Sequence, residues 1–311
     1  MHLTFRHFSA IRRHMLLAVA ASALCGTPAL AADKISVTAS FSILGDVVRV
    51  VGGDRVQVNT LVGPDEDAHV FEPRPQDAKT LLASTLVVTN GLGFEPWAAK
   101  LIKSAGYKGE VVVAAQGVKA RNMAPEPGHG GHAHHEADPH AWQNPLNVVV
   151  YARNIAQALA KVDPAGAAHY QANTEAYAKE LVALDQWARE QISAIPKEKR
   201  KVITSHDAFG YFAAQYGVQF LAPQGVNTDT EPSAKQVAQL IRQIQREKIR
   251  AVFVENMSNP KLIAQLSKDA GAILGQQLYA DALSKADQPG ASYLQMMRHN
   301  LGALVAGMQR N

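Results

Sequence analysis

The chain has 311 residues, of which 47% are hydrophobic and 19% charged, so enough apolar material is present for packed cores. This composition excludes the disordered, collagen-like and polytopic membrane classes, and the length favours two lobes of about 130 residues each. Residues 1–31 hold three arginines and no acid, which leaves 28 basic against 27 acidic residues in the remainder. A nearly neutral remainder does not predict nucleic acid or another polyanion as a partner.

The first 31 residues have the pattern of a cleaved secretory signal. Arg12 and Arg13 precede an apolar run of about eleven residues, and 29–31 reads Ala-Leu-Ala, a typical cleavage site. The run is too short for a hydrocarbon core of ~30 Å, which argues against a membrane-spanning anchor. A lipid anchor on Cys25 is the alternative, although the residue before it is not small. We expect export to the periplasm and a mature chain with no cysteine, hence with no disulfide and no thiolate ligand.

Strand and helix patterns alternate after the signal. In the first half we expect strands over 34–40, 55–62, 85–91 and 109–116, with helices over 41–53, 76–84 and from Pro96 onward. In the second half we expect strands over 201–206, 218–223, 251–256 and 275–281, with helices over 207–216, 232–248, 260–270 and the last twenty or so residues. This alternation predicts an α/β fold in which each lobe has a mostly parallel four-stranded sheet flanked by helices.

A long uninterrupted helical pattern lies between the two halves. It begins at Asp163-Pro164, where Asp can cap and Pro can occupy the first turn, and it stops before Pro196. About thirty helical residues would span ~45 Å and would join two lobes stiffly, unlike a Gly/Ser linker. We therefore expect an N-terminal lobe over 32–162, a connecting helix over 163–195 and a C-terminal lobe over 196–311.

A low-complexity segment, residues 122–138, interrupts the first half. Residues 129–140 hold five of the chain's twelve histidines, and the Gly and Pro spacing predicts a loop. One interpretation is a solvated polar loop that binds metal only adventitiously. The other is a weak collector of divalent metal ions, because clustered neutral imidazoles suit zinc, copper and nickel. The collector would use His129, His132, His134 and His135.

Four candidate metal ligands follow predicted strands. His69 follows 55–62, His140 follows the loop that leaves 109–116, His206 ends 201–206, and Asp281 ends 275–281. Because open parallel sheets bind ligands beyond the carboxyl ends of their strands, these residues are candidates for one crevice, with two from each half. Three imidazoles and one carboxylate suit tetrahedral zinc best, since manganese and iron(II) generally take more oxygen ligands. Each residue alone has a structural alternative; Asp281, for example, could cap a helix.

Seven stretches carry a family resemblance over essentially the whole mature chain. They are DAHVFEPRPQDAKTLLAS (67–84), NGLGFEPW (90–97), ADPHAWQNP (137–145), TSHDAFGYF (204–212), EPSAKQ (231–236), VFVENMSNPKL (252–262) and YADALS (279–284). Together they resemble the metal-binding solute receptors of bacterial ABC importers, the cluster A-I proteins for zinc and manganese. The resemblance implies two lobes joined by one rigid backbone helix.

The same resemblance carries metal-ligand roles onto His69, His140, His206 and Asp281. The His-rich loop and the histidine at 206 are similar to the zinc-type members, since manganese members typically place a carboxylate at that position. Glu255, at another predicted strand end, is expected to support a ligand from behind or to cap a helix.

The resulting hypothesis is capture of periplasmic Zn(II) by a monomeric receptor. The receptor would deliver the ion to an inner-membrane permease that is driven by a cytoplasmic ATPase, and a periplasmic metallochaperone is a further candidate partner. A manganese or iron(II) receptor, and a periplasmic zinc buffer or adhesin without a transporter, stay as alternatives. Since ligand imidazoles must be neutral, we expect affinity to fall as the pH drops through roughly 6.

An enzyme is the alternative from another class, and we do not expect one. The stretch from His135 to His140 has one residue too many for the HExxH motif and contains Pro139, so it cannot form that helical zinc site. The chain also has no GxSxG, P-loop, deaminase or Rossmann signature.

Overall fold

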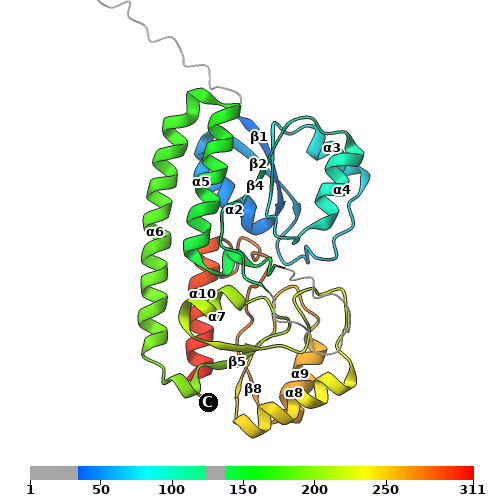
Figure 1. Cartoon of the computed structure of the whole chain (residues 1–311), viewed down its shortest axis with the longest axis vertical. Coiled ribbons are helices and arrows are strands. Elements are labelled where there is room, and N and C mark those ends of the chain that lie inside the picture. Colours follow the sequence, from blue (N-terminus) through cyan, green and yellow to red (C-terminus); the bar gives the residue numbers. More distant parts are fainter. Residues whose placement is uncertain (1–33, 123–136) are drawn as a thin grey trace, which may run out of the picture. The chain divides into compact units, whose positions relative to one another are not determined.

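Two parallel four-stranded sheets organise the chain, which confirms the predicted α/β class with two lobes (Figure 1). The structure is a computed structural model and describes residues 34–122 and 137–311. The predicted signal and the four loop histidines at 129, 132, 134 and 135 lie outside these described residues.

The first sheet has the order β2-β1-β3-β4 with every neighbouring pair parallel. Its strands are β1 (Ile35–Phe41), β2 (Val56–Val62), β3 (Leu86–Thr89) and β4 (Glu110–Val113). Helices α2 (Ser42–Gly52), α3 (Pro75–Leu82) and α4 (Pro96–Ala105) make the crossovers. The carboxyl ends of all four strands therefore point to the same edge of this sheet.

The second sheet repeats this arrangement with the order β6-β5-β7-β8, again parallel, and with shorter strands. The strands are β5 (Lys201–Ile203), β6 (Gln219–Leu221), β7 (Ala251–Val252) and β8 (Ile273–Leu274). The connecting helices are α7 (Gly210–Tyr216), α8 (Ala234–Glu247) and α9 (Pro260–Ala270).

Local signals explain where many of these helices begin and end. Proline occupies the first turn of α3, α4 and α9, where its missing N–H costs no hydrogen bond. Ser233 caps α8 by accepting from the backbone N–H of Gln236. Gly106 and Gly271 end α4 and α9 with φ of 70° and 66°, a left-handed conformation that glycine adopts without strain.

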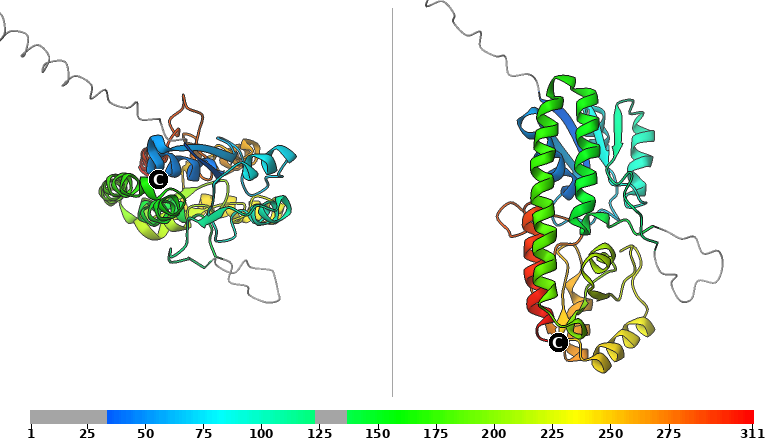
Figure 2. Two further views of the ribbon diagram at one scale, coloured as in Figure 1. Left: turned by 90° about the horizontal axis from the view of Figure 1, so that it is seen from above. Right: turned by 60° about the vertical axis from the view of Figure 1, so that its left-hand side comes forward.

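Three helices lie along one side of the two sheets, and the longest of them, α6, runs beside both (Figures 1 and 2). They are α5 (Pro145–Val162), α6 (Ala167–Ser193) and α10 (Tyr293–Met308). Helix α6 packs against α5 and α2, and α10 packs against α6, α2 and the strands β5 and β7. The predicted long helix is α6, preceded by a 3₁₀ turn over Pro164–Gly166. Its 27 residues span ~40 Å at the usual rise per residue.

Helix α5 is not among the elements predicted from the sequence. It begins with Asn144, whose side chain accepts from the backbone N–H of Leu146, and with Pro145 in the first turn. The N-cap signal is therefore present, and it lies directly after the His140 region.

One large apolar core runs through both halves of the chain, and a smaller one lies beneath α8 and α9 in the second half. Val37 from the first sheet, Trp142, Tyr177 of α6, Phe212 of α7 and Met297 of α10 all belong to it. Burying such side chains together contributes roughly 1.5–3 kcal/mol each. The sheets are therefore held by shared packing as well as by the helix that connects them.

The predicted strand over 275–281 is wrong. The last strand, β8, ends at Leu274, and Leu278 makes only an isolated parallel bridge with Glu255. The backbone N–H of Tyr279 donates to Asn300 Oδ1 at 2.9 Å, and the carbonyl of Tyr279 accepts from Asn300 Nδ2 at 2.7 Å. A side chain of α10 thus takes the place of a neighbouring strand. The predicted strand over 201–206 likewise ends early, at Ile203.

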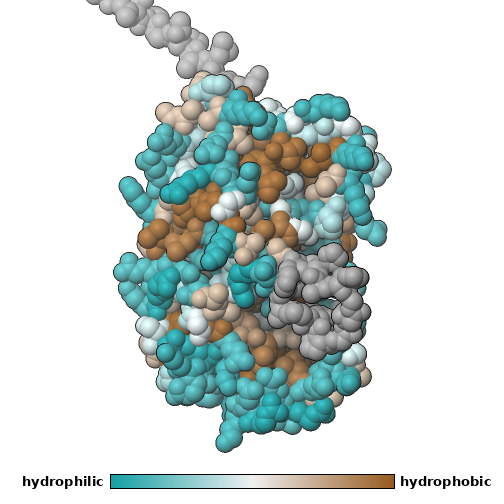
Figure 3. All heavy atoms as spheres, viewed as in Figure 1, coloured by the Kyte–Doolittle hydropathy of each residue, from teal (hydrophilic) through white to brown (hydrophobic). Residues whose placement is uncertain are grey.

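Exposed apolar side chains are spread along the chain. Val70, Leu82 and Val182 are about half exposed, at 50%, 52% and 51%. Hydrophilic side chains break up the hydrophobic patches on the face shown in Figure 3. No helix within residues 34–122 and 137–311 is both long and apolar enough to span a bilayer.

Candidate metal centre

Four side chains from distant parts of the chain meet at one point. The ligand atoms of His69, His140, His206 and Asp281 all lie within 4.8 Å of one another. His69 Nε2 lies 3.3 Å from His140 Nε2 and 3.2 Å from Asp281 Oδ2. Asp281 Oδ2 also lies 3.0 Å from His206 Nε2, while its Oδ1 lies 3.6 Å from His140 Nε2. All three imidazoles thus present the same nitrogen to one carboxylate.

His69 lies in the loop between β2 and α3. Its backbone N–H donates to Asp67 Oδ1 at 2.9 Å, and the carbonyl of Ala68 accepts from Trp97 Nε1 at 2.7 Å. The imidazole meets the ring of Phe94 edge to face, with 4.7 Å between centroids. These contacts hold the backbone on either side of the ring and leave Nε2 free to face the cluster.

His140 follows Asp138 and Pro139 and precedes a short 3₁₀ turn before α5. One oxygen of Asp138 accepts from both the backbone N–H and Nδ1 of His140, at 3.0 and 2.9 Å. Because Nδ1 is hydrogen-bonded to this carboxylate, Nε2 is the nitrogen that can bind a metal ion. Asn90 Nδ2 donates to the Pro139 carbonyl at 3.0 Å and so holds the preceding backbone.

His206 lies three residues beyond the end of β5 and is fully buried. Its Nδ1 donates to Glu255 Oε2 in a short hydrogen bond. Glu255 Oε1 accepts from the backbone N–H groups of Ser205 and His206 at 2.9 and 3.2 Å. Glu255 therefore contacts His206 from behind, and the isolated bridge to Leu278 keeps its backbone in place.

Asp281 is placed by residues of the other half of the chain. Trp142 Nε1 and Gln143 Nε2 donate to the carbonyl of Ala280 at 2.9 and 2.8 Å. With the histidine proton on Nδ1, both buried oxygens of Asp281 and the Nε2 atom of His206 have no hydrogen-bond partner within the described residues. Buried polar atoms without partners are costly, so this cluster is completed by a group that it does not itself contain.

The charged neighbours within the cluster shift the pKa values of its side chains in the direction opposite to the effect of burial. Burial alone lowers the pKa of His140, but Asp281 and Asp138 outweigh it and raise that pKa to about 9. Burial likewise disfavours charge on His206, yet Glu255 and Asp281 hold its pKa well above the ordinary value. Burial acts to raise the pKa of Asp281, and His206 and His140 hold it well below the ordinary value instead. The sequence-based expectation that metal affinity falls as the pH drops through about 6 is therefore wrong for His140 and His206. The neighbouring carboxylates raise the pKa of both imidazoles, so protons compete with the metal at higher pH.

The cluster includes all four residues that the sequence singled out, and it adds a carboxylate that the sequence analysis missed. In the sequence, Asp138 is only the last residue of the segment over 122–138 that is predicted to be a loop. Its place two residues before a histidine is the signal that could have identified it, since Asp67 holds the same position relative to His69 and also accepts the histidine N–H.

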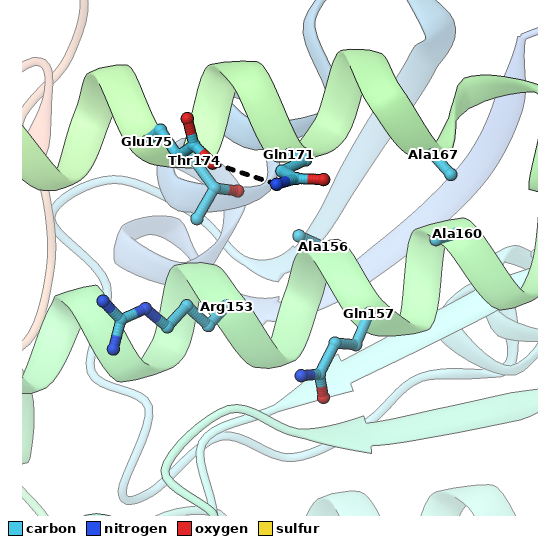
Figure 4. A pocket seen from close by; sticks show the side chains of 8 residues that line it. All are labelled: Arg153, Ala156, Gln157, Ala160, Ala167, Gln171, Thr174 and Glu175. Carbon is cyan, nitrogen blue, oxygen red and sulfur yellow. Dashed lines mark hydrogen bonds between the residues drawn. The ribbon is translucent and has the colours of Figure 1, made fainter.

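A separate hollow of about 470 Å³ lies between α5 and α6 (Figure 4). Alanines 156, 160 and 167 line it, and Gln171 donates to Glu175 along one helix beside them. The hollow presents no imidazole, and it shares no residue with the metal cluster.

The fold and the cluster define a metal-binding solute receptor, and the comparisons with known proteins agree. The family model for ZnuA, zinc-uptake complex component A, periplasmic, matches residues 37–307. The chain is 31% identical over 284 residues to the manganese ABC transporter substrate-binding lipoprotein PsaA of Streptococcus pneumoniae, with 89% of this chain and 90% of that protein covered. It is 33% identical over 296 residues to the iron-binding protein YfeA of Yersinia pestis, with 93% of each covered.

Solved structures are similar as well. The periplasmic zinc-binding protein TroA of Treponema pallidum matches with a TM-score of 0.80 at 26% identity, over 88% of this chain and 99% of that chain. The chain belongs to the ZnuA family of metal-binding solute-binding proteins of ABC importers. It is accordingly a non-enzymatic protein that captures metal for an importer, and a permease is its implied partner.

Proposed function

We propose that this chain captures Zn(II) in the periplasm and delivers it to the permease of an ABC importer. The ligands are His69, His140, His206 and Asp281. The spacing of the ligand atoms carries the proposal. Zinc bonds of about 2.0–2.1 Å in a tetrahedron place neighbouring ligand atoms about 3.3 Å apart. Four of the pairs lie 3.3, 3.2, 3.0 and 3.6 Å apart, the last through the other oxygen of Asp281, and all the ligand atoms lie within 4.8 Å of one another.

The chemistry of the donor set supports the same ion. Three imidazoles and one carboxylate are borderline ligands that suit zinc, and the described residues offer no thiolate. The carboxylates behind His140 and His206 hold the proton on Nδ1, which keeps the Nε2 lone pair available. Four protein ligands complete a tetrahedron, which is typical of a site that holds its ion rather than one that activates water.

Manganese is the second candidate. Both oxygens of Asp281 are buried and lack a hydrogen-bond partner within the described residues, so this side chain can bind through two oxygens and enlarge the coordination. The names of PsaA and YfeA also specify manganese and iron.

Competition between metals tests the proposal. Protein stripped with a chelator is reloaded from an equal mixture of zinc and manganese, and the bound metal is measured by elemental analysis. We expect one tightly held zinc ion per chain, lost when His69, His140 and His206 are all replaced by alanine. The control is His169→Ala, because His169 lies on α6 away from the cluster. Tight zinc in the triple variant would refute the site, whereas preferential manganese uptake would refute only the choice of metal.

The His-rich loop stays a prediction. We propose that His129, His132, His134 and His135 add weaker binding equivalents to the tight site. Deletion of residues 122–136 should remove these looser equivalents and leave the tight one. Equal stoichiometry before and after deletion would show that the loop collects no metal.

A further inference from the structure

One carboxylate links a metal-facing histidine to a loop in the other half of the chain. Asp67 Oδ1 accepts the backbone N–H of His69 at 2.9 Å. Its other oxygen, Oδ2, accepts from Thr228 Oγ1 at 2.7 Å, although Thr228 lies 161 positions further along the chain. Both oxygens of Asp67 are therefore occupied, one by each half of the chain.

The segment that carries Thr228 is otherwise loosely attached. Residues 222–233 connect β6 to α8 without a helix or strand. Val226 is buried, at 5% exposure, whereas Asn227 and residues 229–231 are exposed. Within the described residues, the other hydrogen bonds of residues 226–233 are to near neighbours in the sequence, between 224 and 237. The bond from the Thr228 hydroxyl to Asp67 is the only one that reaches a more distant part of the chain. The beginning of the loop is held more firmly, because the carbonyl of Gly225 accepts from the backbone N–H of Asp207 at 3.1 Å. Among the described residues, 226–233 have only the Thr228 bond to a distant part of the chain, and a segment with so few attachments opens locally at low cost.

The opposite end of the His69 loop is firmly anchored. The backbone N–H of Asp65 donates to the Leu283 carbonyl at 2.9 Å, and Asn256 Nδ2 donates to Asp65 Oδ1 at 2.9 Å. Asp65 also has a φ of 60°, which is strained for a residue other than glycine. The loop is therefore attached at Asp65, at Ala68 through the hydrogen bond from Trp97 Nε1, and at Asp67 through the single hydrogen bond from Thr228.

His69 lies on the more accessible side of the cluster. The side chains of His140, His206 and Asp281 have no exposed surface, whereas the His69 side chain keeps 3% of its surface exposed and the residue as a whole is only partly buried. An ion that leaves the cluster must first lose its bond to one ligand, and the least buried ligand can withdraw at the lowest cost. Whatever holds the backbone of His69 in place therefore controls release.

We propose that Thr228 is a positioning residue that slows release of the bound ion, because its hydrogen bond to Asp67 holds the His69 loop against residues 226–233. This inference rests on the proposed function, and it adds to that function a residue that does not touch the metal. When the hydrogen bond breaks, the loop loses its attachment to residues 226–233 and keeps those at Asp65 and Ala68, so that His69 can shift away from the other ligands. Binding of the ion, in turn, orders residues 226–233 through Asp67.

Removal of the Thr228 hydroxyl tests the proposal. Zinc-loaded protein is mixed with excess chelator in a stopped-flow instrument, and the rate of zinc release is recorded. Thr228→Val keeps the shape but not the donor, and it should release zinc about tenfold faster, in line with the loss of a hydrogen bond to a charged group. Thr228→Ser restores the donor and should stay within about twofold of wild type. The matched control is Thr230→Val, since the Thr230 hydroxyl bonds only its neighbour Asp229, at 3.3 Å.

A second measurement separates positioning from general loosening of the loop. Hydrogen exchange should show that zinc protects residues 226–233 in wild type and in Thr228→Ser, and protects them less in Thr228→Val. In an Asp67→Ala background the valine substitution should add no further acceleration, because the acceptor is already gone. Thr228→Ala supplies an independent removal of the hydroxyl should the valine variant fold poorly.

The outcomes are distinguishable. If wild type retains zinc and Thr228→Val releases it at the same rate, the positioning role is refuted and the proposed function stands. Additive effects of Thr228→Val and Asp67→Ala would also refute it. If wild type itself fails to retain zinc, the proposed function and this inference fail together.

Discussion

Replacement of Glu255 by glutamine tests how the ring of His206 is oriented. Glu255 is fully buried, its Oε2 accepts from His206 Nδ1, and its Oε1 accepts from the backbone N–H groups of Ser205 and His206. The imidazole therefore carries its proton on Nδ1 when it binds metal, and Nε2 faces Asp281 at 3.0 Å.

Glutamine has the same shape but only one acceptor. If its oxygen stays with the two backbone N–H groups, its NH₂ group faces Nδ1 and favours the tautomer with the proton on Nε2, where the metal binds. If the amide flips, its NH₂ group meets two N–H donors and leaves them without an acceptor. Loss of such a supporting carboxylate costs about 10–100-fold in metal affinity, or roughly 1–3 kcal/mol.

Zinc affinity is measured by competition with a chromophoric chelator, and the melting temperature of the metal-free protein is recorded in parallel. The matched control is Glu95→Gln, a buried glutamate outside the metal cluster whose Oε1 accepts from the Ser40 hydroxyl and from the backbone N–H of Asn90. We expect the affinity to fall in Glu255→Gln and to hold in Glu95→Gln. Zinc affinity within about twofold of wild type in a folded Glu255→Gln protein would refute the orienting role.

Three further predictions follow from titration and packing. Metal binding should release protons at pH 7 and strengthen as the pH rises toward 9, because the pKa of His140 is about 9 before binding. Calorimetry in buffers of different ionisation enthalpy counts the released protons, and a count of zero would contradict this prediction. Burial raises the pKa of Glu95 to about 7 from 4.5, so the unfolded chain ionises first and stability falls by ~3 kcal/mol as the pH rises through this interval. Glu95→Gln should abolish that fall in urea unfolding at pH 5 and pH 8, and an unchanged fall would argue against it. Asn311→Ala should destabilise the protein by about 2–4 kcal/mol in urea, since this side chain bonds the backbone of Lys199, Lys201, Arg250 and Ala251; unchanged stability would exclude this role.

The sequence predicted the first sheet better than the second. Strand β3 is a buried, largely apolar run, and β1 alternates apolar and small polar residues. Helix α2 between them ends with glycine and α3 begins with proline, so local patterns are sufficient there. The second sheet has strands of two or three residues, too short for a periodic pattern to mark their ends. The side chain of Asn300 also replaces a strand partner at Tyr279, and no pattern within 275–281 reveals that contact.

The candidate ligands could be named from the sequence because their chemistry is local. A histidine or aspartate after a predicted strand is visible in the chain itself, and parallel strands bring such positions to one edge. The groups that orient these ligands were harder to assign. Asp138 falls at the end of a segment that is predicted to be a loop, and the position of Glu255 at a predicted strand end fits both support of a ligand and capping of a helix.

The sequence alone determined the alternation of strands and helices, the long helix and the four residues that meet in the cluster. Only the tertiary structure decided how those residues are held. Glu255 lies 49 positions from His206, Trp142 lies 138 positions from the carbonyl it binds at Ala280, and Thr228 lies 161 positions from Asp67. Such partners are brought together by the packing of whole elements, and hydrogen bonds form only at distances that packing sets. For this reason a local pattern can identify a metal-binding side chain, whereas the network that orients it appears only in the folded chain.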